Sequence, residues 1–69
     1  MPGTENFGQR LYMLRTKAEL TQQQLADELN VTRRILSDWE HGRKLPSFDS
    51  IIAIAKFFGV TTDYVMLGK

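Results

Sequence analysis

The chain contains no cysteine among its 69 residues. A disulfide framework and a thiolate metal site are therefore excluded, and the composition suits a reducing cytoplasm, where we expect the protein to act. No apolar run is long enough to span a membrane, because the longest, residues 51–60, is interrupted by Lys56 and Gly59. The first residues also lack a basic region followed by an apolar run, so no signal peptide is predicted. We expect one small domain that does not enter a membrane.

Histidine is nearly absent as well, since His41 is the only one. With no cysteine and no second histidine to accompany it, no metal site is predicted. The inventory for catalysis is thin, because a single histidine is present and no glycine-rich phosphate loop is found. We therefore expect no active site, no metal and no cofactor.

The net charge is only +1, but the charged residues are unevenly distributed. Residues 18–29 carry three carboxylates and no cation. Residues 30–44 carry two carboxylates and four cations, Arg33, Arg34, Arg43 and Lys44. A local cluster of cations is usually a solvated face, but it is also the electrostatic footprint of many nucleic-acid interfaces.

Apolar residues recur at helical spacing in five short segments, and no segment alternates as a strand would. The predicted helices cover about residues 6–17, 21–29, 32–41, 47–58 and 61–66. The last four begin at residues that favour N-caps, namely Thr21, Thr32, Ser47 and Thr61. Three helices end at residues that tolerate a left-handed backbone, namely Asn30, Gly42 and Gly59. Because such short helices are unstable alone, they must pack together, which predicts an all-α, compact five-helix bundle.

The most specific feature lies between Thr21 and Gly42, where two amphipathic helical segments are joined by a tight turn at Asn30-Val31. Thr21 and Gln24 have the spacing of a capping box at the start of the first segment. A helix that is entered through a sharp turn exposes its first residues at a corner of the molecule. Here that corner carries paired arginines, which suits the major groove of a DNA duplex.

These residues resemble the lambda-repressor-like, Cro/Xre-type helix-turn-helix domain. The resemblance covers roughly residues 6–67 and rests on the pattern Phe7, Leu11, Leu14-Arg15, Leu20-Thr21-Gln22, Leu25-Ala26, Val31-Thr32, Leu36, Trp39-Glu40, Gly42, Pro46, Ala55 and Phe58-Gly59-Val60. It implies a DNA-binding domain over 6–67, with the motif at about 21–41 and a flexible arm at 1–5. Asn30 stands where the family often has glycine, and Asp38 departs from the family at a position that commonly faces bases.

The resemblance also implies roles for individual residues. The residues expected to read bases are Thr32, Arg33, Arg34, Ile35, Ser37 and Asp38. The residues expected to contact phosphates are Gln22, His41, Arg43 and Lys44. Arg15 and Glu40 match the family's structural ion pair, and Trp39 is expected in the core. The implied function is sequence-specific binding of double-stranded DNA by a transcriptional regulator, of the phage or mobile-element repressor type.

Three of these residues have a second interpretation. Asp38 lies four residues after Arg34 and is expected to orient that arginine, although it could instead accept from a cytosine amino group or simply relieve local charge. Ile35 either touches a thymine methyl group or is a partly buried residue at the helix edge. His41 either approaches a phosphate or is merely exposed.

Apolar residues near the C-terminus exceed what one small core can absorb. We expect a self-association surface formed by Ile52, Phe57, Tyr64, Val65 and Met66. A two-fold homodimer would place its two reading helices about 34 Å apart, on a palindromic operator. The alternative is an antitoxin-like module whose main partner is another protein, bound through the same C-terminal helices.

Overall fold

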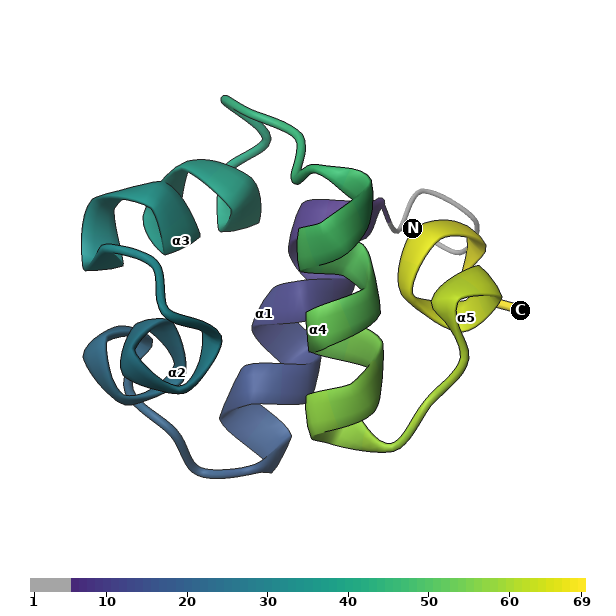
Figure 1. The fold of residues 1–69 in the computed structure, drawn as a ribbon, viewed down its shortest axis with the longest axis horizontal. Coiled ribbons are helices and arrows are strands. Elements are labelled where there is room, and N and C mark those ends of the chain that lie inside the picture. Colours follow the sequence, from purple (N-terminus) through teal and green to yellow (C-terminus); the bar gives the residue numbers. More distant parts are fainter. Residues whose placement is uncertain (1–5) are drawn as a thin grey trace.

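The computed structural model describes residues 6–69, so the arm expected at residues 1–5 lies outside the described residues. The described chain forms five helices and no strand: α1 (Phe7–Lys17), α2 (Gln22–Leu29), α3 (Arg33–Glu40), α4 (Phe48–Phe58) and α5 (Thr62–Leu67). Helices α2 and α3 form one side of the molecule and α5 the opposite side, with α1 and α4 between them (Figure 1). The prediction of an all-α five-helix bundle is confirmed. None of the helices in residues 6–69 has the length and apolar composition needed to cross a lipid bilayer.

Local sequence explains where each helix begins. A side-chain oxygen at every N-cap accepts a hydrogen bond from the amide three residues later, at Asn6, Thr21, Thr32, Ser47 and Thr61. The predicted capping box of Thr21 and Gln24 is present, and Asn6 with Gln9 forms a second one that was not predicted. These bonds satisfy amide groups that would otherwise have no partner in the first turn.

Left-handed residues explain where the helices end. Asn30, Gly42 and Gly59 have φ values of 58°, 76° and 68°, as predicted from their types. Glu19 also adopts a φ of 61° after α1, although a glutamate has a Cβ that disfavours this conformation. The reversal at Glu19 directs the chain from α1 into α2.

The core draws side chains from all five helices. Its buried apolar members are Phe7, Leu11, Leu25, Ala26, Leu36, Trp39, Ile51, Ile54, Ala55 and Val65. Leu14, which the helical spacing places on the buried face of α1, is only half-buried. Trp39 is 4% exposed, so the prediction that it belongs to the core is confirmed.

Two residues of α1 fix the positions of its neighbours. Gly8 lies against the end of α3, where a Cβ atom would come within 2.6 Å of the carbonyl oxygens of Trp39 and Glu40. Arg10 is buried, and its Nε and Nη2 atoms donate to the carbonyl oxygens of Val65 (3.0 Å) and Met66 (2.8 Å). This arginine supplies donors and positive charge at the C-terminal end of α5, and both stabilise a helix end of that polarity. Helix α1 is therefore the frame that holds α3 and α5 on opposite sides.

Candidate nucleic-acid interface

The turn between α2 and α3 is closed by backbone hydrogen bonds. The amide of Val31 donates to the carbonyl of Ala26 at 3.0 Å, and the left-handed Asn30 reverses the chain. Thr32 then accepts from the amide of Ile35 at 3.1 Å and so caps α3 one residue after the turn. Helix α3 consequently starts at a corner of the molecule, as predicted.

Arg33 and Arg34 occupy the first turn of α3, and both are exposed. Within residues 6–69 neither side chain forms an ion pair or a hydrogen bond with another residue. Cations at a helix N-terminus oppose the helix dipole and cost a few tenths of a kcal/mol each, roughly. The guanidinium groups of both arginines are therefore available to an anionic ligand.

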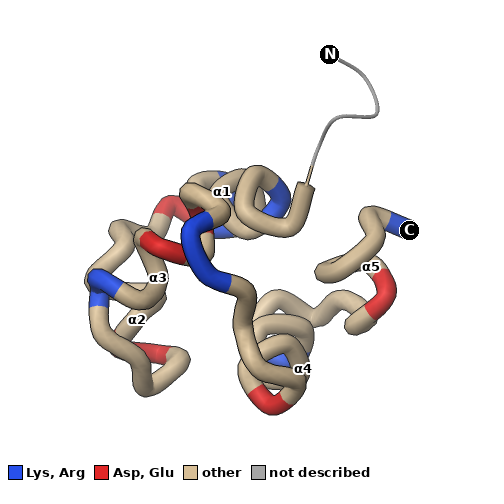
Figure 2. Tube along the Cα trace, turned by 90° about the horizontal axis from the view of Figure 1, so that it is seen from above, with Lys and Arg blue, Asp and Glu red and all other residues tan. Residues whose placement is uncertain are grey.

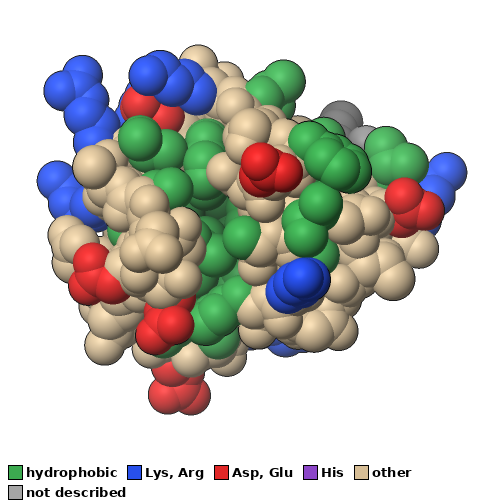
Figure 3. Space-filling view, in the orientation of Figure 1, with side chains coloured by type: hydrophobic (Ala, Val, Ile, Leu, Met, Phe, Trp, Pro, Cys, Tyr) green, Lys and Arg blue, Asp and Glu red, His purple; other side chains and the backbone are tan. Residues whose placement is uncertain are grey.

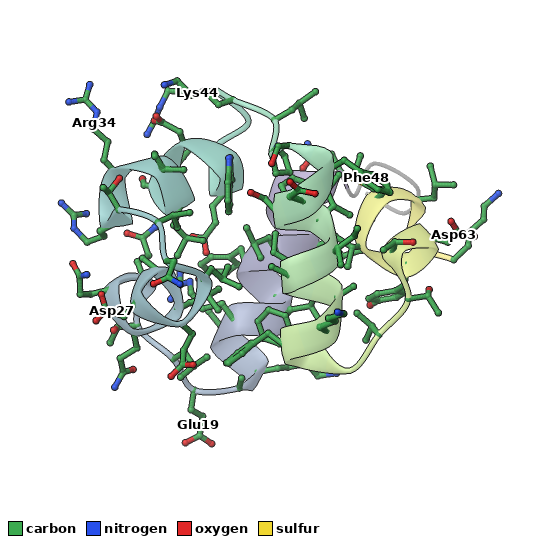
Figure 4. The ribbon with its side chains drawn as sticks, viewed as in Figure 1. Glu19, Asp27, Arg34, Lys44, Phe48 and Asp63 are labelled. Atoms are coloured by element: carbon green, nitrogen blue, oxygen red, sulfur yellow. The ribbon has the colours of Figure 1, made fainter. Side chains whose placement is uncertain are left out.

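The basic residues lie at both ends of α3. Figure 2 shows one group at the start of the helix and the other in the loop that follows it. Arg34 and Lys44 extend from the same side of the molecule, while Glu19 extends from the loop between α1 and α2 at the opposite edge and Asp27 lies on α2 (Figure 4). The space-filling view shows the same separation of charge (Figure 3). The uneven charge of the sequence thus becomes a basic edge along α3.

Asp38 does not pair with Arg34, and that prediction is wrong. Its Oδ1 atom instead accepts from Nε of Arg43 at 2.8 Å. This hydrogen bond holds the pKa of the Asp38 carboxyl below its usual value, and the charges of Lys44 and Arg34 act in the same direction, against the effect of burial. The cause is the backbone, because the chain reverses at Gly42 and returns Arg43 to the last turn of α3.

The remaining predicted base readers differ in their surroundings. Thr32 is exposed and Ser37 is half-buried on the outer side of α3. Ile35 is half-buried and packs against the hydrophobic core, as expected of a residue at the helix edge. Ile35 is therefore a partly buried residue at the helix edge, and its contact with a thymine methyl group stays a prediction.

His41 follows α3 and is exposed. Its Nδ1 atom lies 2.8 Å from the carbonyl oxygen of Ser37. The same Nδ1 atom lies 3.3 Å from Oγ of Ser37, so Ser37 holds the ring through both its backbone and its side chain. His41 is thus oriented beside the basic loop, and within residues 6–69 no group of three or more side chains could hold a metal with it.

A buried polar network joins α1, α2 and α3. Arg15 and Glu40 form the expected ion pair, with Nε to Oε2 at 2.6 Å and Nη2 to Oε1 at 3.1 Å. Gln22 joins them, because its Nε2 atom donates to Oε1 of Glu40 at 3.0 Å. The first residue of α2 is therefore tied to the last residue of α3, which fixes the two helix ends relative to each other.

The predicted self-association surface is partly wrong. Val65 is 1% exposed, because it packs into the core from α5 and cannot belong to a surface. Ile52 and Tyr64 are half-buried, and Phe57 and Met66 are exposed. Two apolar side chains with a larger exposed fraction were not predicted. Leu45 (75% exposed) lies in the basic loop, and Phe48 (72% exposed) lies at the start of α4.

The sequence of this chain is similar to known helix-turn-helix proteins. Residues 11–65 match the helix-turn-helix family. The HTH-type transcriptional activator BcrR of Enterococcus faecalis is 44% identical over 63 residues, which are 91% of this chain and 31% of BcrR. The HTH-type transcriptional regulator ImmR of Bacillus subtilis (strain 168) is 36% identical over 64 residues, which are 93% of this chain and 50% of ImmR. This chain therefore spans half or less of either relative.

The fold is also similar to solved structures. The P22 c2 repressor protein, crystallised in complex with a synthetic operator, superposes with a TM-score of 0.90. The superposition covers 96% of this chain and 100% of the P22 chain, at 26% sequence identity. The likeness therefore extends beyond the two motif helices to the complete five-helix scaffold.

Proposed function

This chain belongs to the helix-turn-helix family, of the lambda-repressor-like type, and on that premise we propose that it binds double-stranded DNA sequence-specifically and regulates transcription. One observation carries the proposal: α3 begins at a corner of the molecule with Arg33 and Arg34 exposed and without partners in the described residues. The protein would act in the cytoplasm and would catalyse no reaction.

In the proposed complex, α3 lies in the major groove and α2 crosses the phosphate backbone. Arg33 and Arg34 reach base edges, where an arginine can donate two hydrogen bonds to one guanine. Thr32 and Ser37 lie on the outer side of the same helix start and supply hydroxyl groups that can donate or accept. These contacts determine which sequence is preferred.

Phosphate contacts hold the domain in register. Gln22 stands at the N-terminus of α2, where free amide groups and the helix dipole favour an anion. Its side chain is already held by Glu40, so the phosphate contact would use the second amide hydrogen or the backbone. Lys44 and His41 would meet phosphates at the other end of α3.

We propose repression as the mode of regulation, as in the P22 c2 repressor, and activation, as in BcrR, is the alternative. A bound repressor blocks polymerase by occupying the operator. A homodimer on a palindromic operator would add a second reading helix about one turn of DNA away. Of the residues predicted for self-association, Phe57 and Met66 are exposed, and Ile52 and Tyr64 are half-buried on the same two helices. Leu45 and Phe48 form a rival surface with greater exposure.

A second candidate function is that of an antitoxin-like module that binds another protein. The observation that favours it is the exposure of three large apolar side chains, Leu45, Phe48 and Leu67. Copurification of one small protein in a fixed ratio, lost on substitution of Phe48 by Glu, would support this function. DNA contact would then be secondary.

Selection of binding sites from a random duplex library tests the proposed function. We expect an enriched sequence, with half-sites about one helical turn apart if the protein binds as a dimer. Binding of the winning sequence at two salt concentrations then separates base reading from charge attraction. If no sequence is enriched and only weak, salt-sensitive binding remains, the proposal of sequence-specific regulation is wrong.

A further inference from the structure

The loop after α3 is folded back onto the helix at Arg43. Gly42 has a φ of 76°, and the amide of Arg43 donates to the carbonyl of Asp38 at 2.9 Å. The amide of Lys44 points to the same carbonyl at 3.4 Å. The backbone of Arg43 is therefore fixed over the last turn of α3 independently of its side chain.

The side chain of Arg43 is anchored mainly through its Nε atom. Nε donates to Oδ1 of Asp38 at 2.8 Å, and Nη2 lies 3.4 Å from Oγ of Ser37, at the outer limit of a hydrogen bond. The Asp38 side chain is 11% exposed, whereas that of Arg43 is 57% exposed. A nearly buried carboxylate thus holds an exposed guanidinium against the side of α3 that carries Ser37.

This arrangement places Arg43 beside the predicted base readers. Ser37 and Asp38 follow Arg34 by three and four residues, so all three share one face of α3. Lys44, the next cation, extends outward from the loop (Figure 4). The side chains of these two consecutive basic residues therefore differ. That of Arg43 is fixed against α3, whereas that of Lys44 forms no hydrogen bond or ion pair within residues 6–69.

The chemistry of an anchored arginine suits a base better than a phosphate. A guanine presents O6 and N7 as two acceptors, and a guanidinium matches them with two N–H groups. With Nε bound to Asp38, the two terminal amino groups of Arg43 are left as that pair. Fixing the guanidinium beforehand lowers the entropy lost on binding. A phosphate contact carries no sequence information and has no need of this support.

We propose that Arg43 reads a guanine through its terminal amino groups and that Asp38 is the positioning residue that aims it. This inference rests on the proposed function, since it assumes that α3 lies in the major groove. It reverses the roles expected from the family pattern, in which Asp38 faces a base and Arg43 meets a phosphate.

The test measures binding of the preferred duplex and of a set in which each base pair is replaced in turn. The proteins are the wild type, Arg43→Ala, Arg43→Lys, Asp38→Asn and the matched control Lys44→Ala. Arg43→Ala should weaken binding of the preferred duplex about 5- to 150-fold. The variant should also bind equally well when one particular G·C pair is replaced. Arg43→Lys should lose the same preference although it keeps the charge.

Asp38→Asn distinguishes a positioning role from a merely structural one, because only a positioning residue should change the base preference at the pair that Arg43 reads. It should relax the preference at the same G·C pair as Arg43→Ala, with Arg43 still present and the helical spectrum unchanged. Lys44→Ala should instead weaken all duplexes equally and lower the salt slope by about 1. If the Asp38 and Arg43 variants lose preference at the same base pair, Asp38 positions Arg43 on that pair.

Three results would overturn the inference. Arg43→Ala could weaken all duplexes equally, with the slope lowered by about 1, which would make Arg43 a phosphate contact. It could also leave binding unchanged, which would reduce the ion pair to an internal contact. In both cases the wild type still prefers one sequence, so the proposed function survives. If the wild type prefers no duplex sequence, both the inference about Arg43 and the proposed function are wrong.

Discussion

Substitution of Gly8 by Ala tests how closely α1 approaches α3. A Cβ atom at this position would lie 2.6 Å from the carbonyl oxygens of Trp39 and Glu40. Carbon and oxygen atoms in close contact are about 3.3–3.6 Å apart, so the two backbones must separate by roughly 0.7 Å or more. Overpacking of this kind costs about 1–3 kcal/mol. The higher helix propensity of Ala offsets up to about 1 kcal/mol of that cost.

The net loss of stability for Gly8→Ala should therefore be about 1–2 kcal/mol, which lowers the Tm of a domain of this size by roughly 5–15 °C. Thermal unfolding followed by far-UV circular dichroism measures it. Met13→Ala is the control, because Met13 is exposed on the same helix and its replacement should change stability by less than about 0.5 kcal/mol. A rise in Tm for Gly8→Ala would show that helix propensity dominates and that the close contact between α1 and α3 does not limit the side chain at this position.

Four substitutions test other parts of the molecule. Glu19→Gly should raise the free energy of unfolding by about 1 kcal/mol in urea denaturation, because glycine adopts a left-handed φ without strain; a loss of stability would refute this. Lys44→Ala should weaken binding to every duplex and lower the salt slope by about 1, and an unchanged slope would remove Lys44 from the interface. Phe57→Glu should give a monomer in sedimentation if the predicted surface forms the dimer. If Phe48→Glu gives a monomer and Phe57→Glu does not, the dimer interface is formed by Leu45 and Phe48.

The elements that depend on neighbouring residues could be predicted from the sequence. The capping box at Thr21, the left-handed turn at Asn30 and the exposed start of α3 each depend on residues within one or two turns. The family pattern added the ion pair of Arg15 and Glu40, which are 25 residues apart and which no local rule would join. Local residue types and the family pattern together therefore determine the fold class and the main motif.

The features that depend on three-dimensional packing could not be predicted in this way. Arg43 reaches Asp38 only because the chain reverses at Gly42, and helical spacing favoured Arg34 as the partner instead. The burial of Val65 depends on how α5 is rotated against α1 and α4, which six residues of sequence do not specify. Gly8 and Arg10 act through contacts with distant helix ends, so their roles left no local signal.

The central claim is that the exposed start of α3 distinguishes DNA sequences. Its most direct test compares Arg33→Ala and Arg34→Ala with the wild type on the selected site and on a scrambled duplex of the same composition. We predict that at least one of these variants loses about 1–3 kcal/mol of binding free energy on the selected site and little on the scrambled one. Lys56→Ala, which removes an exposed cation from α4, should change neither. Equal losses on both duplexes would contradict the claim and reduce the two arginines to phosphate contacts.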